Sequence, residues 1–332
     1  MAWDNPLVQS NAPLPAAWDP WDPWDRIVVD NWSLLGQEQQ GSEGAQWLED
    51  PEGRHWLHKD VVIKSGFRQG EDWSEVMSSA VAFAMGASRA DTRLCRRCGR
   101  DGSLSLSVKP LGYNMFDGGV WLDGHPKVQG YLVGVRETDA LVRPGHTLGN
   151  IEVALSEVEA PPGTDDHDLT AFDHFVGYLL LDALVANRDR HEQNWAVLEP
   201  QLGEDLARLA PSYDHATSLG FNLRDDDRCK RIADTQALER FAAHGTAWRF
   251  EHPKGQRPPA LVDLAVAALA LASPRGRQHW IDTVRRLDLI PACQALNGVE
   301  VSGLSEPART FISLILDLNL RRLRDAIDSR TA

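Results

Sequence analysis

Cysteine is scarce in this chain of 332 residues, which contains four: Cys95, Cys98, Cys229 and Cys293. Secreted folds that depend on disulfides use far more, so the scarcity predicts a reduced, cytoplasmic protein. Cys95 and Cys98 form a lone C-x-x-C pair, and no second pair follows at the spacing of a zinc site. A hairpin turn before Gly99 is therefore favoured over zinc, and over a redox pair, which would need a thioredoxin-like strand and helix around it.

Long apolar runs and an excess of positive charge are also missing. No basic stretch followed by an apolar one opens the chain, and Asp182 interrupts the best apolar run, 177–186. We therefore expect neither a signal peptide nor a membrane span. Lys and Arg number 34 against 48 Asp and Glu, a net charge of −14. Direct nucleic-acid binding, which needs a cationic surface, is disfavoured.

The pattern along the chain predicts an α+β fold with a β-rich first part and a helical second part. Its length is sufficient for two lobes. We divide it into an extended Trp- and Pro-rich segment with a W-D-P repeat (1–25), a β-rich N-lobe (26–111), an insertion or linker (112–149) and a helical C-lobe (150–332). The tryptophans of the first segment are expected to dock on the body of the protein, and a partner-binding arm is the alternative.

Several elements can be placed more closely. Strands are expected around residues 26–35, 54–64, 91–97 and 103–111. Helices are expected at 71–85, with Gly86 as the stop, and at 169–186, 234–244, 260–271, 275–287 and 307–327. Residues 165–168 are the expected N-cap of the helix at 169–186, and Asn187 is its expected C-cap.

A polar stretch, N-R-D-R-H-E-Q-N at 187–194, separates the apolar helix from the apolar residues that follow it. Polar side chains between two core segments are costly unless they are solvated, paired or functional. Asp189 and Asn194 lie five residues apart in this loop, and Asp214 follows in S-Y-D-H-A-T-S-L-G. A loop Asp, an Asn five residues later and a further Asp are the working residues of a protein-kinase-like site, in which the last two ligate Mg²⁺. A surface loop of salt bridges made by Arg188, Asp189 and Arg190 is the alternative.

The first half of the chain offers the matching nucleotide-binding residues. Lys59 lies on an expected strand, with Lys64 in reserve, and Glu75 lies on the following helix, with Glu71 in reserve. In a kinase, the strand lysine holds the phosphates and the helix glutamate holds the lysine. Upstream, backbone N–H groups of a Gly-Ser-Glu-Gly segment could cover the phosphates, which makes these residues candidates: Gly41, Ser42 and Gly44.

These motifs resemble the HipA-like kinase family, bacterial relatives of Ser/Thr kinases. The resemblance rests on the N-x-D-R-H-x-x-N loop, the later Asp with its Ser-Leu-Gly element, the lysine strand with its helix, and the closing segment 304–327. It implies a bilobal protein-kinase-like fold that uses ATP and Mg²⁺. It also implies roles for the individual residues: catalysis by Asp189, metal ligation by Asn194 and Asp214, ATP binding by Lys59 paired with Glu75, and a structural role for His191 in the catalytic loop.

The expected activity is transfer of the ATP γ-phosphate to a hydroxyl, with Ser or Thr of a protein as the expected acceptor. Toxin members of the family carry a further N-terminal subdomain, and the stretch before Gly41 is short for it, which argues against an antitoxin-like (HipB-like) partner. Two alternatives remain open. The D-R-H-x-x-N string also resembles phosphatidylinositol kinases, which suggests a lipid or small-molecule acceptor, and a pseudokinase could bind nucleotide as an interaction module.

Overall fold

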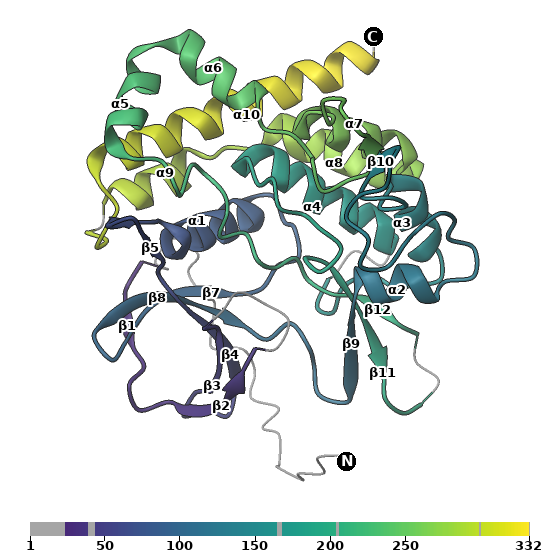
Figure 1. The fold of residues 1–332 in the computed structure, drawn as a ribbon, viewed down its shortest axis with the longest axis horizontal. Helices are drawn as coiled ribbons and strands as arrows, with labels where there is room; N and C mark the ends of the chain where they lie inside the picture. Colours follow the sequence, from purple (N-terminus) through teal and green to yellow (C-terminus); the bar gives the residue numbers. More distant parts are fainter. Residues whose placement is uncertain (1–23, 39–43, 165–167, 204–205, 299, 332) are drawn as a thin grey trace.

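The computed structural model describes residues 24–38, 44–164, 168–203, 206–298 and 300–331. Figure 1 shows the strands of the first hundred residues below a mass of helices that the rest of the chain supplies. Helix α1 (Glu71–Ala84) lies between the two parts. The β-rich first part and the helical second part expected from the sequence are both present.

The N-terminal sheet has six strands in the order β1-β7-β8-β4-β3-β2. The strands are β1 (Ile27–Val28), β2 (Ser33–Gln37), β3 (Gln46–Glu49), β4 (His55–Asp60), β7 (Thr92–Arg97) and β8 (Arg100–Leu106). Every neighbouring pair is antiparallel except β1 and β7. A hairpin of β5 (Ile63–Lys64) and β6 (Phe67–Arg68) then leads into α1.

The two faces of this sheet have different partners. Side chains of a strand alternate between the faces, so Trp56 and Lys59 of β4 point in opposite directions. Trp56 belongs to a small core on one face, together with Cys95 of β7. Leu94, the neighbour of Cys95, packs into the main core with α1 on the other face. Lys59 pairs with Ser103, which in turn pairs with Leu94, so Lys59 lies on the face that α1 covers.

The turn between β7 and β8 contains Cys98, which is exposed, whereas Cys95 is buried within β7. All four cysteines are free. Burial raises the pKa of the Cys95 thiol well above its usual range, which keeps it protonated and unreactive. The hairpin turn predicted before Gly99 is confirmed.

Helix α4 (Ala171–Val185) is the centre of the helical part, and every one of its residues is buried. It begins at a capping box in which the Thr170 side chain accepts a hydrogen bond from the Asp173 backbone, and the Asp173 side chain accepts one from the Thr170 backbone. Thr170 is therefore the N-cap; of the cap expected at 165–168, residues 165–167 lie outside the described residues. At the other end Ala186, not Asn187, takes the left-handed conformation, with φ 56°.

Six further helices surround α4: α5 (Asp225–Ala233), α6 (Thr235–Ala243), α7 (Leu261–Leu271), α8 (Pro274–Arg286), α9 (Ile290–Asn297) and α10 (Glu306–Thr331). Helices α7, α8 and α10 contact α4 directly. A Cβ atom at Gly177 of α4 would lie 2.2 Å from the Trp280 ring, so glycine is what lets α8 approach this closely. The predicted helices are confirmed within a few residues, and α5 and α9 are additional.

Residues 112–149, expected as an insertion or linker, contribute regular structure to the helical part. They form β9 (Tyr113–Asp117), α2 (Gly118–Gly124) and β10 (Leu141–Val142), and α3 (Leu148–Ala154) follows. Strand β9 pairs with β11 (Ala196–Pro200), which also pairs with β12 (Arg208–Leu209). Strand β10 pairs with β13 (His252–Pro253). The domain boundaries drawn from the sequence stay a prediction.

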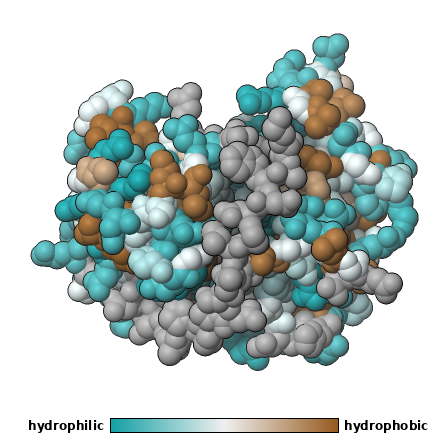
Figure 2. Space-filling view, turned by 90° about the horizontal axis from the view of Figure 1, so that it is seen from below, coloured by the Kyte–Doolittle hydropathy of each residue, from teal (hydrophilic) through white to brown (hydrophobic). Residues whose placement is uncertain are grey.

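The surface is mixed in character. On the face drawn in Figure 2, hydrophobic residues lie in small groups separated by hydrophilic ones. Within the described ranges, no helix combines the length and the apolar character that crossing a membrane would need.

Candidate active site

The loop after α4 winds back on itself and brings Asp189 and Asn194 into contact. The Asp189 backbone N–H donates to Asn187 Oδ1 at 3.0 Å. The Asp189 backbone carbonyl accepts from His191 N and from Asn194 Nδ2, each at 2.7 Å. The five-residue spacing noticed in the sequence is therefore the spacing of a closed, hydrogen-bonded loop.

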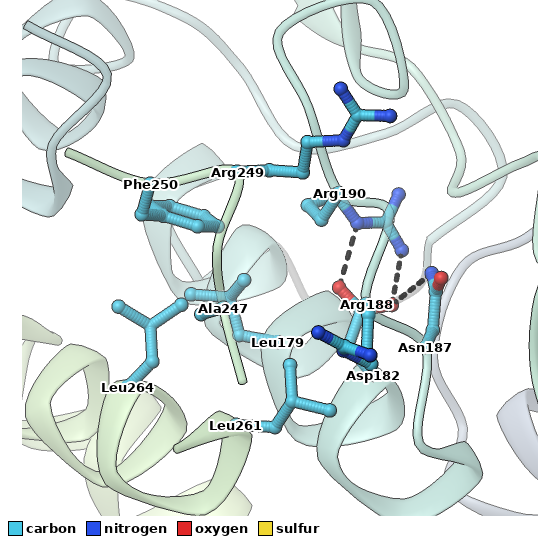
Figure 3. Close-up of a pocket in the computed structure, with 10 residues that line it drawn as sticks. All are labelled: Leu179, Asp182, Asn187, Arg188, Arg190, Ala247, Arg249, Phe250, Leu261 and Leu264. Carbon is cyan, nitrogen blue, oxygen red and sulfur yellow. Dashed lines mark hydrogen bonds and ion pairs between the residues drawn. The ribbon is translucent and has the colours of Figure 1, made fainter. Parts of the chain in front are cut away.

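The base of this loop is a buried ion pair between Asp182 of α4 and Arg190 (Figure 3). Arg190 Nε and Nη2 each donate to an Asp182 carboxylate oxygen at 2.8 Å, and Asn187 Nδ2 donates to the same carboxylate at 2.8 Å. Arg190 Nη1 donates to the Asn194 carbonyl at 2.6 Å. Each charged side chain is only 2% exposed, so the pair is dry and persists because nearly all its polar atoms are bonded.

Arg190 is thus not part of a surface salt bridge, which the alternative interpretation of the loop assumed. Asp182 was visible in the sequence only as an interruption of an apolar run. A carboxylate inside a helix that is buried all round must find a cation or neutralise, and that signal could have identified both residues.

A chain of buried contacts continues from Arg190 to helix α1. Arg190 Nη2 donates to Ser212 Oγ at 3.0 Å, and Ser212 Oγ lies 2.7 Å from His215 Nε2. Glu75 Oε1 of α1 accepts from the His215 backbone N–H at 3.0 Å and lies 3.3 Å from His215 Nδ1. The loop 187–194, the segment that carries Asp214 and helix α1 are therefore joined into one polar network.

Lys59 and Asp214, distant in sequence, form an ion pair with 2.6 Å between Nζ and Oδ1. Burial alone would raise the pKa of the Asp214 carboxyl, but the Lys59 charge and hydrogen bond outweigh it and lower that pKa. Conversely, burial would lower the pKa of Lys59, but the Asp214 and Glu75 charges raise it. Both side chains therefore remain charged around neutral pH.

Among the described residues, no ion pair joins Lys59 to Glu75, which the sequence analysis paired. Glu75 instead holds the backbone beside Asp214, while still lying near enough for its charge to raise the pKa of Lys59. Asp214 itself has a φ of 59°, the left-handed region that non-glycine residues seldom adopt. Backbone strain of this kind persists only where the surroundings impose it, and it is found mostly at functional sites.

The segment after Asp214 is also hydrogen-bonded to residues 70–74 at the start of α1. Ser74 Oγ donates to the Ser218 carbonyl at 2.9 Å, and the Gly70 N–H donates to the Phe221 carbonyl at 2.9 Å. Gly220 has a φ of 68°, and a Cβ atom there would lie 2.7 Å from the Phe311 ring. The Ser-Leu-Gly element therefore shapes the turn that positions Asp214.

Two oxygens of this site have no protein hydrogen-bond donor among the described residues: Asn194 Oδ1 and Asp214 Oδ2. The amide nitrogen of Asn194 is engaged by Asp189, and Lys59 engages the other Asp214 oxygen. Amide and carboxylate oxygens are the donors that Mg²⁺ takes, with water and phosphate oxygens filling its remaining positions. The residues fit a magnesium ion shared with a nucleotide. The described part of the chain holds no group of three or more His, Cys, Asp or Glu suited to a metal ion.

The Asp189 carboxylate is engaged by a residue that the sequence did not reveal. Arg249 Nε donates to Asp189 Oδ1 at 2.6 Å, and Arg249 Nη2 lies 2.5 Å from the same oxygen. The Arg249 guanidinium also lies 3.8 Å from the centroid of the Trp248 ring. The sequence around Arg249 does not predict this contact, because the two residues lie sixty positions apart.

The backbone of Arg249 is held by a buried histidine. His146 Nδ1 lies 2.8 Å from the Arg249 carbonyl, and His146 Nε2 accepts from Trp195 Nε1 at 3.3 Å. Burial lowers the pKa of His146 to about 4, so the ring is neutral at physiological pH. His146 thereby links Arg249 to Trp195, the neighbour of Asn194.

The remaining predicted residues are placed as follows. His191 is half-buried, its Nδ1 accepts from the Gln193 N–H at 3.1 Å, and burial lowers its pKa. Gly44 lies in the exposed connection between β2 and β3, with φ 94°. Gly41 and Ser42 lie outside the described residues. Of the reserve candidates, Lys64 is exposed on β5, and burial raises the pKa of Glu71 at the start of α1.

Comparison with known proteins supports the fold. No protein-family model matches the chain. No curated protein matches it. Among solved structures, the proinflammatory kinase CtkA of Helicobacter pylori is similar, with a TM-score of 0.67 and 14% identity over 92% of this chain and 97% of that one.

Two further structures are similar at lower scores. HipA of Shewanella oneidensis, in a complex with HipB and operator DNA, has a TM-score of 0.46 and 12% identity over 93% of this chain and 69% of that one. A Golgi casein kinase has a TM-score of 0.38 and 10% identity over 91% of this chain and 75% of that one. The likeness to CtkA shows a kinase-like fold, which confirms the α+β, bilobal architecture expected from the HipA-like motifs.

Proposed function

We propose that this protein is an ATP- and Mg²⁺-dependent kinase that transfers the γ-phosphate to a Ser or Thr hydroxyl of a protein. The observation that carries the proposal is the Lys59–Asp214 ion pair at 2.6 Å. This ion pair joins a lysine on an N-lobe strand to the segment that carries Asp214. Hydrogen bonds of Glu75 and Arg190 hold that segment beside the loop of Asp189 and Asn194. Phosphoryl transfer depends mainly on charged groups held in position, and these residues supply a cation for the phosphates and carboxylates for the metal ion and the acceptor.

Each residue has a defined task in this proposal. Lys59 binds phosphate oxygens of ATP, which replace Asp214 as its partner when the nucleotide binds. Asn194 Oδ1 and the Asp214 carboxylate hold the metal ion, which neutralises developing charge on the phosphates when it is bound. Glu75 fixes the backbone next to Asp214 through His215.

Asp189 is the proposed catalytic residue. It orients the acceptor hydroxyl and takes its proton as the acceptor oxygen bonds to the γ-phosphorus. The bond from that phosphorus to the bridging oxygen of ATP breaks, and ADP leaves with that oxygen. In the structure Arg249 holds Oδ1 of this carboxylate, and no described residue donates to Oδ2, which is the oxygen left to accept the proton.

The test is transfer of label from γ-labelled ATP with Mg²⁺ to a whole-cell lysate, by the wild-type protein and by Asp189→Asn. We expect protein bands that the wild type labels and the variant does not, with a loss of about 10²–10⁴-fold. Asp325→Asn, on the exposed side of α10, is the matched control and should label as the wild type does. Equal labelling by the wild type and Asp189→Asn would overturn the catalytic assignment.

The same experiment separates the alternatives. Label in a lipid or a small molecule would replace the protein acceptor, as the likeness of the loop to phosphatidylinositol kinases allows. Protection from thermal unfolding by Mg·ADP, with no transfer to any fraction of the lysate, would indicate a pseudokinase.

A further inference from the structure

A hollow of about 470 Å³ lies beside the loop 187–194 and is lined in part by Arg249, the residue that pairs with Asp189. Its walls come from the stretch 117–143 and from the catalytic loop itself. We call it the acceptor hollow, and these residues line it: Asp117, Gly119, Val120, Tyr131, Val133, Gly134, Arg136, Arg143, His191, Glu192, Gln193 and Arg249. The stretch expected as an insertion thus supplies most of a cavity next to the proposed catalytic residue.

Three guanidinium groups face this hollow, and only two of them have a carboxylate partner. Arg143, which is buried, pairs with Glu192 at 3.0 Å. Arg249 pairs with Asp189 at 2.5 Å. Arg136 is exposed and forms no ion pair or side-chain hydrogen bond with the described residues. Burial lowers the pKa of Arg143, the Glu192 charge opposes this, and the charges of Arg249 and Arg136 lower the pKa further, so both of these cations lie within electrostatic range of Arg143.

The reaction would leave this cluster short of negative charge. When Asp189 takes the acceptor proton on its free oxygen, its carboxylate becomes neutral. Arg249, stacked on Trp248 and anchored by His146, then loses the negative charge of its partner while it lies within electrostatic range of the Arg143 cation. A carboxylate brought in by the acceptor would bond Arg249 and Arg136 and relieve that repulsion.

The lining also has apolar surface at the mouth of the hollow. Val120 is 51% exposed and Val133 is 57% exposed. Apolar rims beside a few charged groups are typical of sites that bind a segment of another molecule. They favour a polypeptide acceptor over a free inorganic anion.

We propose that the acceptor hollow binds a protein segment in which the hydroxyl-bearing residue is flanked by acidic side chains, with Arg136 and Arg249 holding a carboxylate. This inference rests on the proposed kinase function. It makes Arg136 a specificity-determining residue, and the incoming carboxylate is what draws Arg249 away from Asp189. The chain as a whole carries a net charge of −14, so attraction of an acidic segment must come from a local site such as this one.

The test is a binding measurement that needs no turnover. Two fluorescein-labelled peptides, one with a serine between glutamates and the other with a serine between glutamines, are titrated with the protein in the presence of Mg·ADP, and fluorescence anisotropy is recorded. We expect the glutamate peptide to bind at least about tenfold more tightly, as loss of a charge-assisted pair predicts. Arg136→Gln should remove most of this preference.

The matched control is Arg286→Gln. Arg286 is exposed at the end of α8, forms no ion pair among the described residues and does not line the hollow, so the preference should survive its loss. Equal binding of the two peptides, or an Arg136→Gln variant that keeps the full preference, would overturn the inference.

A calorimetric titration of the same preparation with Mg·ADP distinguishes a failure of this inference from a failure of the proposed kinase function. Nucleotide binding with no preference between the peptides contradicts the acceptor hollow alone. Selective binding of the glutamate peptide that depends on Arg136, without phosphate transfer to its serine, would support the site and count against the kinase.

Discussion

The molecule contains two sets of opposite charges near its catalytic loop, and they differ in what surrounds them. In the Asp182–Arg190 pair each side chain is 2% exposed, whereas Lys59 and Asp214 are 22% and 35% exposed. Arg249 and Asp189 resemble the second pair, with 20% and 26% exposed. Of these three pairs, only the enclosed one is bonded to protein on nearly every side.

This difference separates the ion pair that holds the fold from the ion pairs whose members can change partners. Asp182 accepts from two arginine nitrogens and one asparagine, and no ligand could replace those donors without opening the core. Asp214 and Asp189 each keep one carboxylate oxygen without a donor among the described residues. An ion pair in partial contact with water is worth little, so its members can change partners at low cost. The exposed pairs are therefore the ones suited to bind nucleotide, metal and acceptor.

The largest effect on stability is expected for Asp182→Asn. The change leaves the buried Arg190 charge without its carboxylate, and such losses cost about 3–5 kcal/mol of unfolding free energy. Urea denaturation followed by circular dichroism measures it, with Asp325→Asn as an exposed control. A loss below about 1 kcal/mol would mean that the enclosed pair does not hold the loop.

Asp214→Asn should show the opposite division between stability and activity. We expect phosphate transfer to fall by about 10²-fold or more, because the metal ion loses its carboxylate. The free energy of unfolding should change by about 1 kcal/mol or less, since the Lys59 pair is partly solvated. Initial rates with labelled ATP and urea denaturation of the same samples check both, and a variant that unfolds easily would contradict the distinction.

Acid should weaken the enclosed region through His146. Its pKa is held at about 4 by burial, against 6.5 for an unperturbed ring, so the unfolded chain gains the proton first. Stability from the neutral ring is thus complete above pH 6.5 and is lost as the pH falls toward 4, by about 3 kcal/mol. His146→Gln removes this titration. The wild-type and variant curves of unfolding free energy against pH should therefore converge in acid, and parallel curves would refute the assignment.

The smallest effect is expected for Arg249→Gln on stability. Its ion pair with Asp189 is partly exposed, so the free energy of unfolding should fall by less than about 1 kcal/mol. Thermal unfolding with and without added salt checks this, because a screened pair should make the wild type more sensitive to salt than the variant. A loss comparable to that of Asp182→Asn would place Arg249 with the enclosed set.

Much of the architecture was predictable because it depends on local patterns. The helix that starts at Glu71 and ends near Gly86 follows from apolar residues at helical spacing and a glycine stop. The N-cap of α4 was misplaced, because Thr170 and Asp173 form their capping box one turn after the acidic stretch that the sequence favoured. The regular structure of residues 112–149 was also missed, because strand β9 is defined by its pairing with β11, which lies far away in the sequence.

The candidate site was predictable in part for the same reason. Asp189, Asn194 and Asp214 were selected from spacing and residue type, and Lys59 from its place on a strand, and the structure brings Lys59 and Asp214 together. The Glu75 contact differs from the expected one, and Arg249 and Asp182 were not selected at all. Their partners lie far away in the sequence or inside the core, where spacing carries no information.

The sequence by itself determined which residues could form helices and strands and which oxygen-bearing side chains could serve phosphate transfer, because propensity, periodicity and side-chain chemistry are local properties. Only the tertiary structure decided which charges are enclosed and which remain partly exposed, and that Arg249 lies on Asp189. Burial and pairing depend on which distant segments fold against each other, and a charge in the dry core behaves differently from the same charge beside water.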